Sequence, residues 1–304
     1  MAGSSESKTL IILALVANAL IAVMKFVAAA VTGSAAMLAE GFHSTADSGN
    51  QLFLLRGAAV SRYAANTKHQ FGRGKELYFW SLMVAVFLFV GGAVVSFYEG
   101  LERFRHPEET TNLAWSLSVL AAAAVFEIVI AFWPAVKEFN KRRGSRNWWR
   151  SIRESKDPAL MVVLFEDSAA VLGVFIAASG ILLGEWTGNP RWDGAASMSI
   201  GVLLAVVAFL VAYEVKSMLV GESASRRARS EIRAAVLAHP KVESIGRLLT
   251  MHMGPENIVV NLDVDFRDGI PVEQVEAAID EIEVAVRQVA PHATQIFVEV
   301  ESAR

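Results

Sequence analysis

Six long stretches of mostly apolar residues restrict the fold more than any other feature of the sequence. They cover approximately residues 9–31, 36–60, 78–101, 112–136, 158–183 and 193–219. A helix needs about 20 such residues to cross the hydrocarbon core of a bilayer, and each stretch is long enough. The first is too long for the apolar part of a signal peptide and others follow it, so we interpret it as a retained helix. The sequence therefore predicts an α-helical membrane protein with six transmembrane helices.

Composition supports this class of protein and excludes others. Charged residues make up 19% of the chain, below the figure of about 25% for soluble domains. Cysteine is absent, which excludes disulfides, thiolate metal sites and cysteine nucleophiles. The net charge of −3 gives no basis for a nucleic-acid partner, and we expect none.

Basic residues gather in two of the connections between the predicted helices. The end of the second helix and the connection after it contain Arg56, Arg62, Lys68, Arg73 and Lys75. The connection after the fourth contains Lys137, Lys141, Arg142, Arg143, Arg146, Arg150, Arg153 and Lys156. The other three connections contain at most two Lys or Arg each. Because basic loops remain in the cytoplasm, both termini are predicted to be cytoplasmic.

The charge balance also divides the chain near Gly221. Residues 1–221 contain 19 Lys and Arg and 17 Asp and Glu, a net charge of +2, whereas residues 222–304 contain 9 and 14, a net charge of −5. We therefore predict a transmembrane domain over 1–221 and a cytoplasmic domain over 222–304.

The predicted cytoplasmic domain has its own pattern of elements. It consists of a helix over 225–237, strands over 242–252 and 257–266, a helix that Pro271 opens, and a strand over 294–300. Apolar and acidic residues alternate over 258–266, as on a sheet with one face in water. The order α-β-β-α-β predicts a small two-layer α/β domain.

Two pairs of ionisable residues lie within the predicted transmembrane helices. His43 and Asp47 are four residues apart in the second helix, so they share one helix face. Glu166 and Asp167 are adjacent in the fifth helix, where two carboxylates repel each other unless a cation or a proton is present. Counted from opposite membrane faces, Asp47 and Asp167 lie roughly 16 and 14 Å into a core about 30 Å thick. We therefore predict one divalent-metal site near the midplane, formed by His43, Asp47, Glu166 and Asp167. The alternative is that each pair is only a polar clamp between helices.

Other polar residues in the predicted helices have different interpretations. Lys25, near the outer end of the first helix, is expected to extend its ammonium group to the membrane surface, with pairing to a site carboxylate as the alternative. Asn18 and Glu127 are candidates for auxiliary ligands or proton carriers. Asn50 and Gln51 are expected to form hydrogen bonds between helices.

These residues and their order resemble the cation diffusion facilitator family of zinc transporters. The resemblance covers nearly the whole chain, with six spans, an α-β-β-α-β tail and two motifs. The first motif is the His-x-x-x-Asp of the second helix, here His43 and Asp47. The second is similar to the family's His-x-Phe-Gly-x-Gly-Lys stretch before the third helix, here His69-Gln70-Phe71-Gly72-Arg73-Gly74-Lys75.

The chain departs from the family's pattern at two places. In the fifth helix the family has His or Asp four residues before the Asp, but Val163 stands four residues before Asp167. Glu166 is the expected replacement ligand, as in a branch of the family with Glu-Asp at this place. The family's second, loop metal site retains only His69, with Asn66 and Arg73 at its partner positions, so we expect this site to be absent.

The resemblance implies a secondary transporter that exports a divalent metal from the cytoplasm in exchange for protons. Zinc is the expected metal, with Mn²⁺, Fe²⁺ or Co²⁺ as alternatives. The resemblance also implies a homodimer in a lipid membrane, and we expect a bacterial inner (plasma) membrane. No organic cofactor is expected.

Two other classes of protein remain as alternatives to the transporter. An intramembrane metalloenzyme is disfavoured, because the sequence has no His-Glu-x-x-His motif, and we expect no enzyme. A non-transporting membrane metal sensor or scaffold is the remaining alternative.

Overall fold

The computed structural model describes residues 3–109, 112–143 and 158–301. The chain divides into two compact units. One joins the chain up to Gly57 with Phe79–Val215, and the other joins Ala58–Tyr78 with the chain from Lys216 onward.

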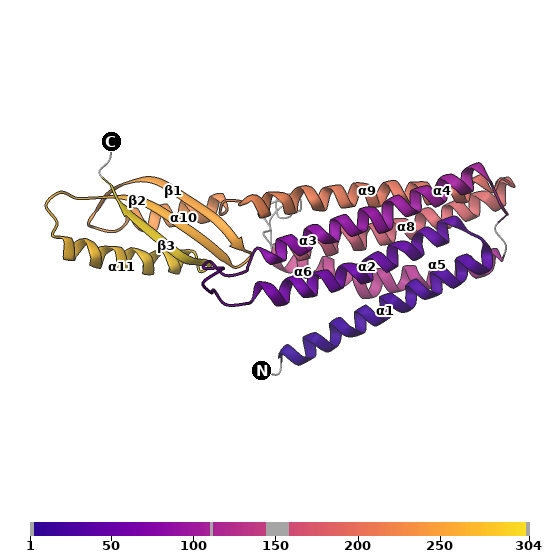
Figure 1. Cartoon of the computed structure of the whole chain (residues 1–304), viewed down its shortest axis with the longest axis horizontal. Helices are drawn as coiled ribbons and strands as arrows, with labels where there is room; N and C mark the ends of the chain where they lie inside the picture. Colours follow the sequence, from indigo (N-terminus) through magenta and orange to yellow (C-terminus); the bar gives the residue numbers. More distant parts are fainter. Residues whose placement is uncertain (1–2, 110–111, 144–157, 302–304) are drawn as a thin grey trace. The chain divides into compact units, whose positions relative to one another are not determined.

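Long helices build the first unit. In chain order they are α1 (Gly3–Thr32), α2 (Ala35–Ser61), the continuous run α3 (Glu76–Phe87), η1 (Leu88–Val94) and α4 (Val95–Arg105), the run α5 (Leu113–Phe126), η2 (Glu127–Phe132) and α6 (Trp133–Arg143), then α8 (Pro158–Thr187) and α9 (Arg191–Val220). The segments η1 and η2 are π-helical. Figure 1 shows the helices with roughly aligned long axes. Each of the six predicted spans lies in one of these helices or runs.

Among the described residues, four helices are long and apolar enough to cross a membrane. They are Glu76–Arg105, Leu113–Lys141, Met161–Thr187 and Arg191–Val220. The part of α1 that qualifies as apolar, Asn18–Thr32, is shorter, and α2 is not among the four. The polar residues that led us to place the metal site on α2 also lower its hydropathy.

The connection predicted after the fourth span begins later than expected. The helix continues to Arg143, so Lys137 and Lys141 belong to α6 and not to a loop. Arg146, Arg150, Arg153 and Lys156, which contribute to the predicted basic loop, lie outside the described residues.

Small residues allow α4 and α9 to approach closely. A Cβ atom added to Gly100 would lie 2.5 Å from the backbone nitrogen of Met198, and one added to Gly194 would lie 2.6 Å from that of Phe104. Ser197 donates a hydrogen bond to the Ser96 carbonyl at 2.8 Å. Such close packing stabilises helix association in lipid, where apolar side chains gain little by leaving the solvent.

The N-terminus of α2 is fixed by a residue of α9. The buried Asp193 carboxylate accepts hydrogen bonds from the backbone N–H of Ala35 at 2.5 Å and of Ala36 at 3.4 Å. It also accepts one from the Ser34 hydroxyl at 2.5 Å. A carboxylate here satisfies free N–H groups and complements the helix dipole. The contact therefore fixes the start of the helix that carries His43 and Asp47.

The second unit contains the predicted α/β domain. Its elements are α10 (Arg226–Leu237), β1 (Val242–Gly254), β2 (Asn257–Phe266), α11 (Val272–Val289) and β3 (Ala293–Val300), in the predicted order. In the described chain the strands form a sheet of order β1-β2-β3, in which β1 and β2 are antiparallel and β2 and β3 are parallel. The parallel pair is connected through α11, as a parallel connection requires (Figure 1).

One apolar core joins the sheet to both helices of this domain. Its fully buried members alternate along β2 and recur at helical spacing in α10 and α11: Ile232, Val236, Val260, Leu262, Val264, Ala278, Ile282 and Val286. Two positions differ from the predicted pattern. Val272, which the spacing of apolar residues after Pro271 places on the buried face of the predicted helix, is exposed at the first turn of α11.

Asp263 is the second difference, because it is buried although we predicted it on the wet face of the sheet. A register shift between Ile245 and Leu248 accompanies this burial. Arg247, in the shifted segment, donates from Nε to Asp263 Oδ2 at 2.6 Å. This hydrogen bond and the charge of Asp263 raise the pKa of Arg247.

The glycine motif before α3 packs within the second unit. A Cβ atom added to Gly74 would lie 2.3 Å from the Met253 carbonyl oxygen, so only glycine fits there. Lys75 Nζ donates to the Leu219 carbonyl at 3.4 Å. The His69 ring contacts the Arg73 guanidinium at 3.1 Å, and this cation beside the imidazole disfavours a metal ion.

Candidate functional site

A small cavity inside the first unit brings together residues from α1, α2, η2 and α8. Its volume is about 50 Å³. Its polar lining consists of Asn18, Ser44, Asp47, Gln51, Glu127, Glu166 and Asp167. Three of the four predicted metal ligands therefore line one cavity, together with both residues that we considered as auxiliary ligands.

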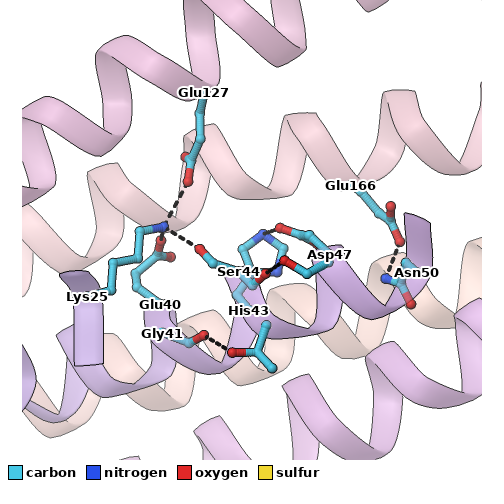
Figure 2. Close-up of polar contacts among 11 residues, drawn as sticks. Lys25, Glu40, Gly41, His43, Ser44, Asp47, Asn50, Glu127 and Glu166 are labelled. Carbon is cyan, nitrogen blue, oxygen red and sulfur yellow. Dashed lines mark hydrogen bonds and ion pairs between the residues drawn. The ribbon is translucent and has the colours of Figure 1, made fainter. Parts of the chain in front are cut away.

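The face of α2 that lines the cavity follows helical spacing. Ser44, Asp47 and Gln51 are three and four residues apart, so they share one face. His43 is fully buried beside this face but is not among the lining residues. Its Nε2 lies 3.6 Å from Asp47 Oδ2, and Figure 2 shows the two side chains next to each other on α2.

The face of α8 that lines the cavity includes Val163, the position at which the chain lacks the His or Asp of the family's pattern. Val163, Glu166, Asp167 and Ala170 all line the cavity, because positions three, four and seven residues apart lie on one helix face. Val163 therefore borders the same cavity as the two carboxylates. Glu166 Oε1 accepts a hydrogen bond from Asn50 Nδ2 at 2.5 Å (Figure 2). The predicted role of Asn50 as a hydrogen-bonding residue between helices is confirmed.

The predicted side chains do not form a closed ligand set. Among the described residues, no three His, Asp or Glu side chains lie close enough together to hold one metal ion. Several buried atoms in this part of the chain nevertheless have no hydrogen-bond partner among the residues described: both ring nitrogens of His43, Asp47 Oδ1, Gln51 Oε1 and Asp167 Oδ2. Buried polar atoms are ordinarily paired. This group of imidazole and oxygen atoms therefore retains the capacity to bind a cation or protons.

Lys25 corrects a prediction, because it does not extend to the membrane surface. It is fully buried, and its Nζ donates to Glu40 Oε2 at 2.8 Å, to Ser44 Oγ at 2.9 Å and to Glu127 Oε1 at 2.8 Å (Figure 2). Two carboxylates within reach make pairing more favourable than extension to the surface.

Sequence analysis missed the role of Glu40. The available signal was a Lys and two Glu at membrane depth in three different predicted helices, since opposite charges there require each other. Glu40 also packs closely against α8, where a Cβ atom on Gly173 would lie 2.2 Å from Glu40 Oε1 and would displace the carboxylate.

Together these features define a class: a helical membrane protein with charged side chains around an internal cavity, followed by an α/β domain. The profile described as "Cation efflux transmembrane domain" matches residues 11–220. The profile described as "Cation efflux protein, cytoplasmic domain" matches residues 224–303. The chain therefore belongs to the cation efflux family, a family of membrane transporters and not of enzymes. The predicted family and fold class are confirmed.

Several characterised proteins are similar to this chain. The human "Proton-coupled zinc antiporter SLC30A9, mitochondrial" is 33% identical over 258 residues, which cover 84% of this chain and 45% of that protein. "Metal tolerance protein C4" of Arabidopsis thaliana is 28% identical over 88% of this chain and 59% of its own length. "Cation-efflux pump FieF" of Escherichia coli is 23% identical over 84% of this chain and 79% of its own. The chain thus spans less than half the length of the human relative.

Proposed function

We propose that this chain is a secondary transporter that exports a divalent metal cation, with zinc as the preferred cargo, from the cytoplasm in exchange for protons. The observation that carries the proposal is that Asp47 of α2 lines the same cavity as Glu166 and Asp167 of α8. The relatives named as a zinc antiporter and a cation-efflux pump support the same cargo and direction.

The proposed cargo ligands are His43, Asp47, Glu166 and Asp167. An imidazole nitrogen with carboxylate oxygens suits Zn²⁺ and also admits Mn²⁺, Fe²⁺ and Co²⁺. Asn50 donates to Oε1 of Glu166 at 2.5 Å, which orients this carboxylate. His43 and Asp47 are neighbours on one helix and move together with α2.

Competition between metal ions and protons for one site accounts for the coupling of metal export to proton entry. Imidazole and carboxylate groups bind either a metal ion or protons. Exchange of one for the other on opposite sides of the membrane couples the two fluxes without ATP. Ionisable side chains inside a membrane are costly to retain, and a transported ion gives the reason for their presence.

We further propose that both termini are cytoplasmic, that the membrane is a bacterial plasma membrane, and that residues 222–304 pair two chains in a homodimer. A domain of this size buries little surface by itself, which supports the pairing. Cross-linking in native membranes should trap a dimer, and monomers under every detergent and metal condition would contradict it.

Transport in proteoliposomes tests the central proposal. With a zinc-sensitive dye inside and a pH gradient across the membrane, the wild type should accumulate zinc uphill until a protonophore collapses the gradient. Mn²⁺, Fe²⁺ and Co²⁺, each added at the same concentration as zinc, should inhibit zinc accumulation only slightly. Unchanged accumulation with the protonophore would point to another coupling ion or a channel. Zinc binding without flux would favour the sensor.

A further inference from the structure

We propose that Lys25 is a positioning residue that holds Glu127 and Ser44 in the wall of the cargo cavity; this inference rests on the proposed function. The ammonium group has three N–H donors, and its three contacts lie at 2.8, 2.9 and 2.8 Å. Its hydrogen-bonding capacity is therefore fully used.

The three acceptors divide into two kinds. Ser44 and Glu127 line the cavity, whereas Glu40 is not among its lining residues. Lys25 therefore contacts two cavity residues and is anchored by a carboxylate outside the cavity. Figure 2 shows its Nζ between Glu40, Ser44 and Glu127.

The network connects every element that lines the cavity. Lys25 belongs to α1, Glu40 and Ser44 to α2, and Glu127 opens η2. Glu40 in turn packs against Gly173 of α8, the helix that carries Glu166 and Asp167. One buried cation thus contributes to the relative positions of all four elements.

Glu127 is the cavity residue that Lys25 restricts most. Lys25 holds its Oε1, while its Oε2 is buried and has no hydrogen-bond partner among the residues that the structure describes. A carboxylate held by one oxygen presents the other in a fixed orientation, so less ordering is required when a cation binds. The π-helical turn at Glu127 is of the kind frequently found at functional sites.

Charge explains why a lysine is needed at this position. Two buried carboxylates without a counter-ion are strongly unfavourable, and removal of one partner of a buried pair leaves an uncompensated charge. The charges of Lys25 and Glu40 cancel, so the three side chains together carry the single negative charge of Glu127. This cancellation provides a charge-matched variant.

The test compares Lys25→Met/Glu40→Gln with the wild type. The double variant removes one positive and one negative charge, so the net charge is unchanged and Glu127 stays but is no longer held. We expect kcat/KM for zinc flux to fall at least about tenfold, the size of one charge-assisted hydrogen bond, mainly through KM. Isothermal titration of the purified protein with zinc should give the same loss of affinity. Glu127→Gln should show a similar loss.

The control is Ser197→Ala, which removes a buried hydrogen bond between α9 and α4 away from the cavity and should leave KM unchanged. Wild-type KM and zinc affinity in folded Lys25→Met/Glu40→Gln would overturn the inference, whereas absence of zinc flux in the wild type would overturn the proposed function instead. If the double variant fails to fold, the triple variant Lys25→Met/Glu40→Gln/Glu127→Gln, which leaves no unpaired charge in the network, decides. Because Lys25 acts through Glu127, the KM of this variant should equal the KM of Glu127→Gln. A further rise in KM would refute the proposed role of Lys25.

Discussion

The helical bundle and the α/β domain differ in the side chains that they bury completely and in the large apolar side chains that they expose. In the domain the fully buried side chains are apolar, such as Val260, Leu262 and Ile282. In the bundle Lys25 and His43 are fully buried. Phe209 and Trp133, by contrast, are 70% and 64% exposed.

The difference follows from the solvent that each unit meets. In water, removal of apolar surface drives folding, so a buried charge is a rarity. In lipid, apolar side chains gain nothing by turning inward, and a buried charge persists for a function. Loss of a buried charge should therefore impair transport in the bundle, whereas loss of a buried apolar group should impair stability in the domain.

The largest effect is expected at the two aspartates of the cavity. Asp47→Ala and Asp167→Ala should each abolish zinc flux in proteoliposomes and leave folding nearly intact, because each removes an anion without opening an apolar cavity. Size-exclusion profiles and thermal midpoints report folding. Thr45→Ala, an exposed position two residues from Asp47, is the control and should transport normally. Normal flux in the combined Asp47→Ala/Asp167→Ala variant would end the shared-site interpretation.

His43 separates loss of transport from a change of cargo. His43→Ala should abolish flux, since it removes the nitrogen ligand. His43→Asp should keep part of the flux with preference shifted toward Mn²⁺, because carboxylate oxygens suit harder cations. The ratio of Mn²⁺ to Zn²⁺ flux measures the shift, and a ratio equal to the wild type would argue against His43 as a ligand.

Glu166 tests whether the carboxylate next to Asp167 replaces the ligand missing at Val163. We expect Glu166→Gln to lose zinc flux to the same extent as Asp167→Asn. Ser168→Ala is the control, because within the described part of the chain its hydroxyl donates to the Leu164 carbonyl of its own helix. Near-wild-type flux in Glu166→Gln would shift the search for the fourth ligand to Asn18 or Glu127.

Two apolar substitutions, one in the domain and one in the bundle, test the part of the comparison that concerns stability. Ile282→Ala removes a fully buried side chain of the domain core and should lower the free energy of unfolding by about 2–5 kcal/mol. Val125→Ala removes a side chain that is 63% exposed on the bundle and should change the thermal midpoint little. Thermal unfolding of both variants in detergent decides, and equal destabilisation would refute the contrast.

The smallest effect is expected at a helix cap. Ser225 caps α10, since its hydroxyl accepts a hydrogen bond from the Ala228 N–H at 3.2 Å, and Ser225→Ala should cost about 1 kcal/mol. Asp193→Ala should cost more, because the Ala35 N–H and the Ser34 hydroxyl then lose a charged acceptor in a buried place. The same thermal assay ranks the two, and the reverse order would contradict the importance of the α9 contact.

The sequence by itself determined the features that local periodicity encodes. Apolar stretches of spanning length gave the helices of the bundle, and the spacing of four between His43 and Asp47 gave their shared face. Alternation and turn residues gave the order of the α/β domain, with strand ends within two residues of those observed. The division at Gly221 and the metal-ligand set stay predictions.

Only the tertiary structure decided which residues of different helices meet. Lys25 with Glu40 and Glu127, Asn50 with Glu166, and Asp193 with the start of α2 are contacts between elements far apart in the chain. Helical spacing fixes which residues share a face, but the rotation of each helix about its axis depends on how all the helices pack. A buried charge can therefore be recognised in the sequence, whereas the partner that makes its burial tolerable is chosen by packing.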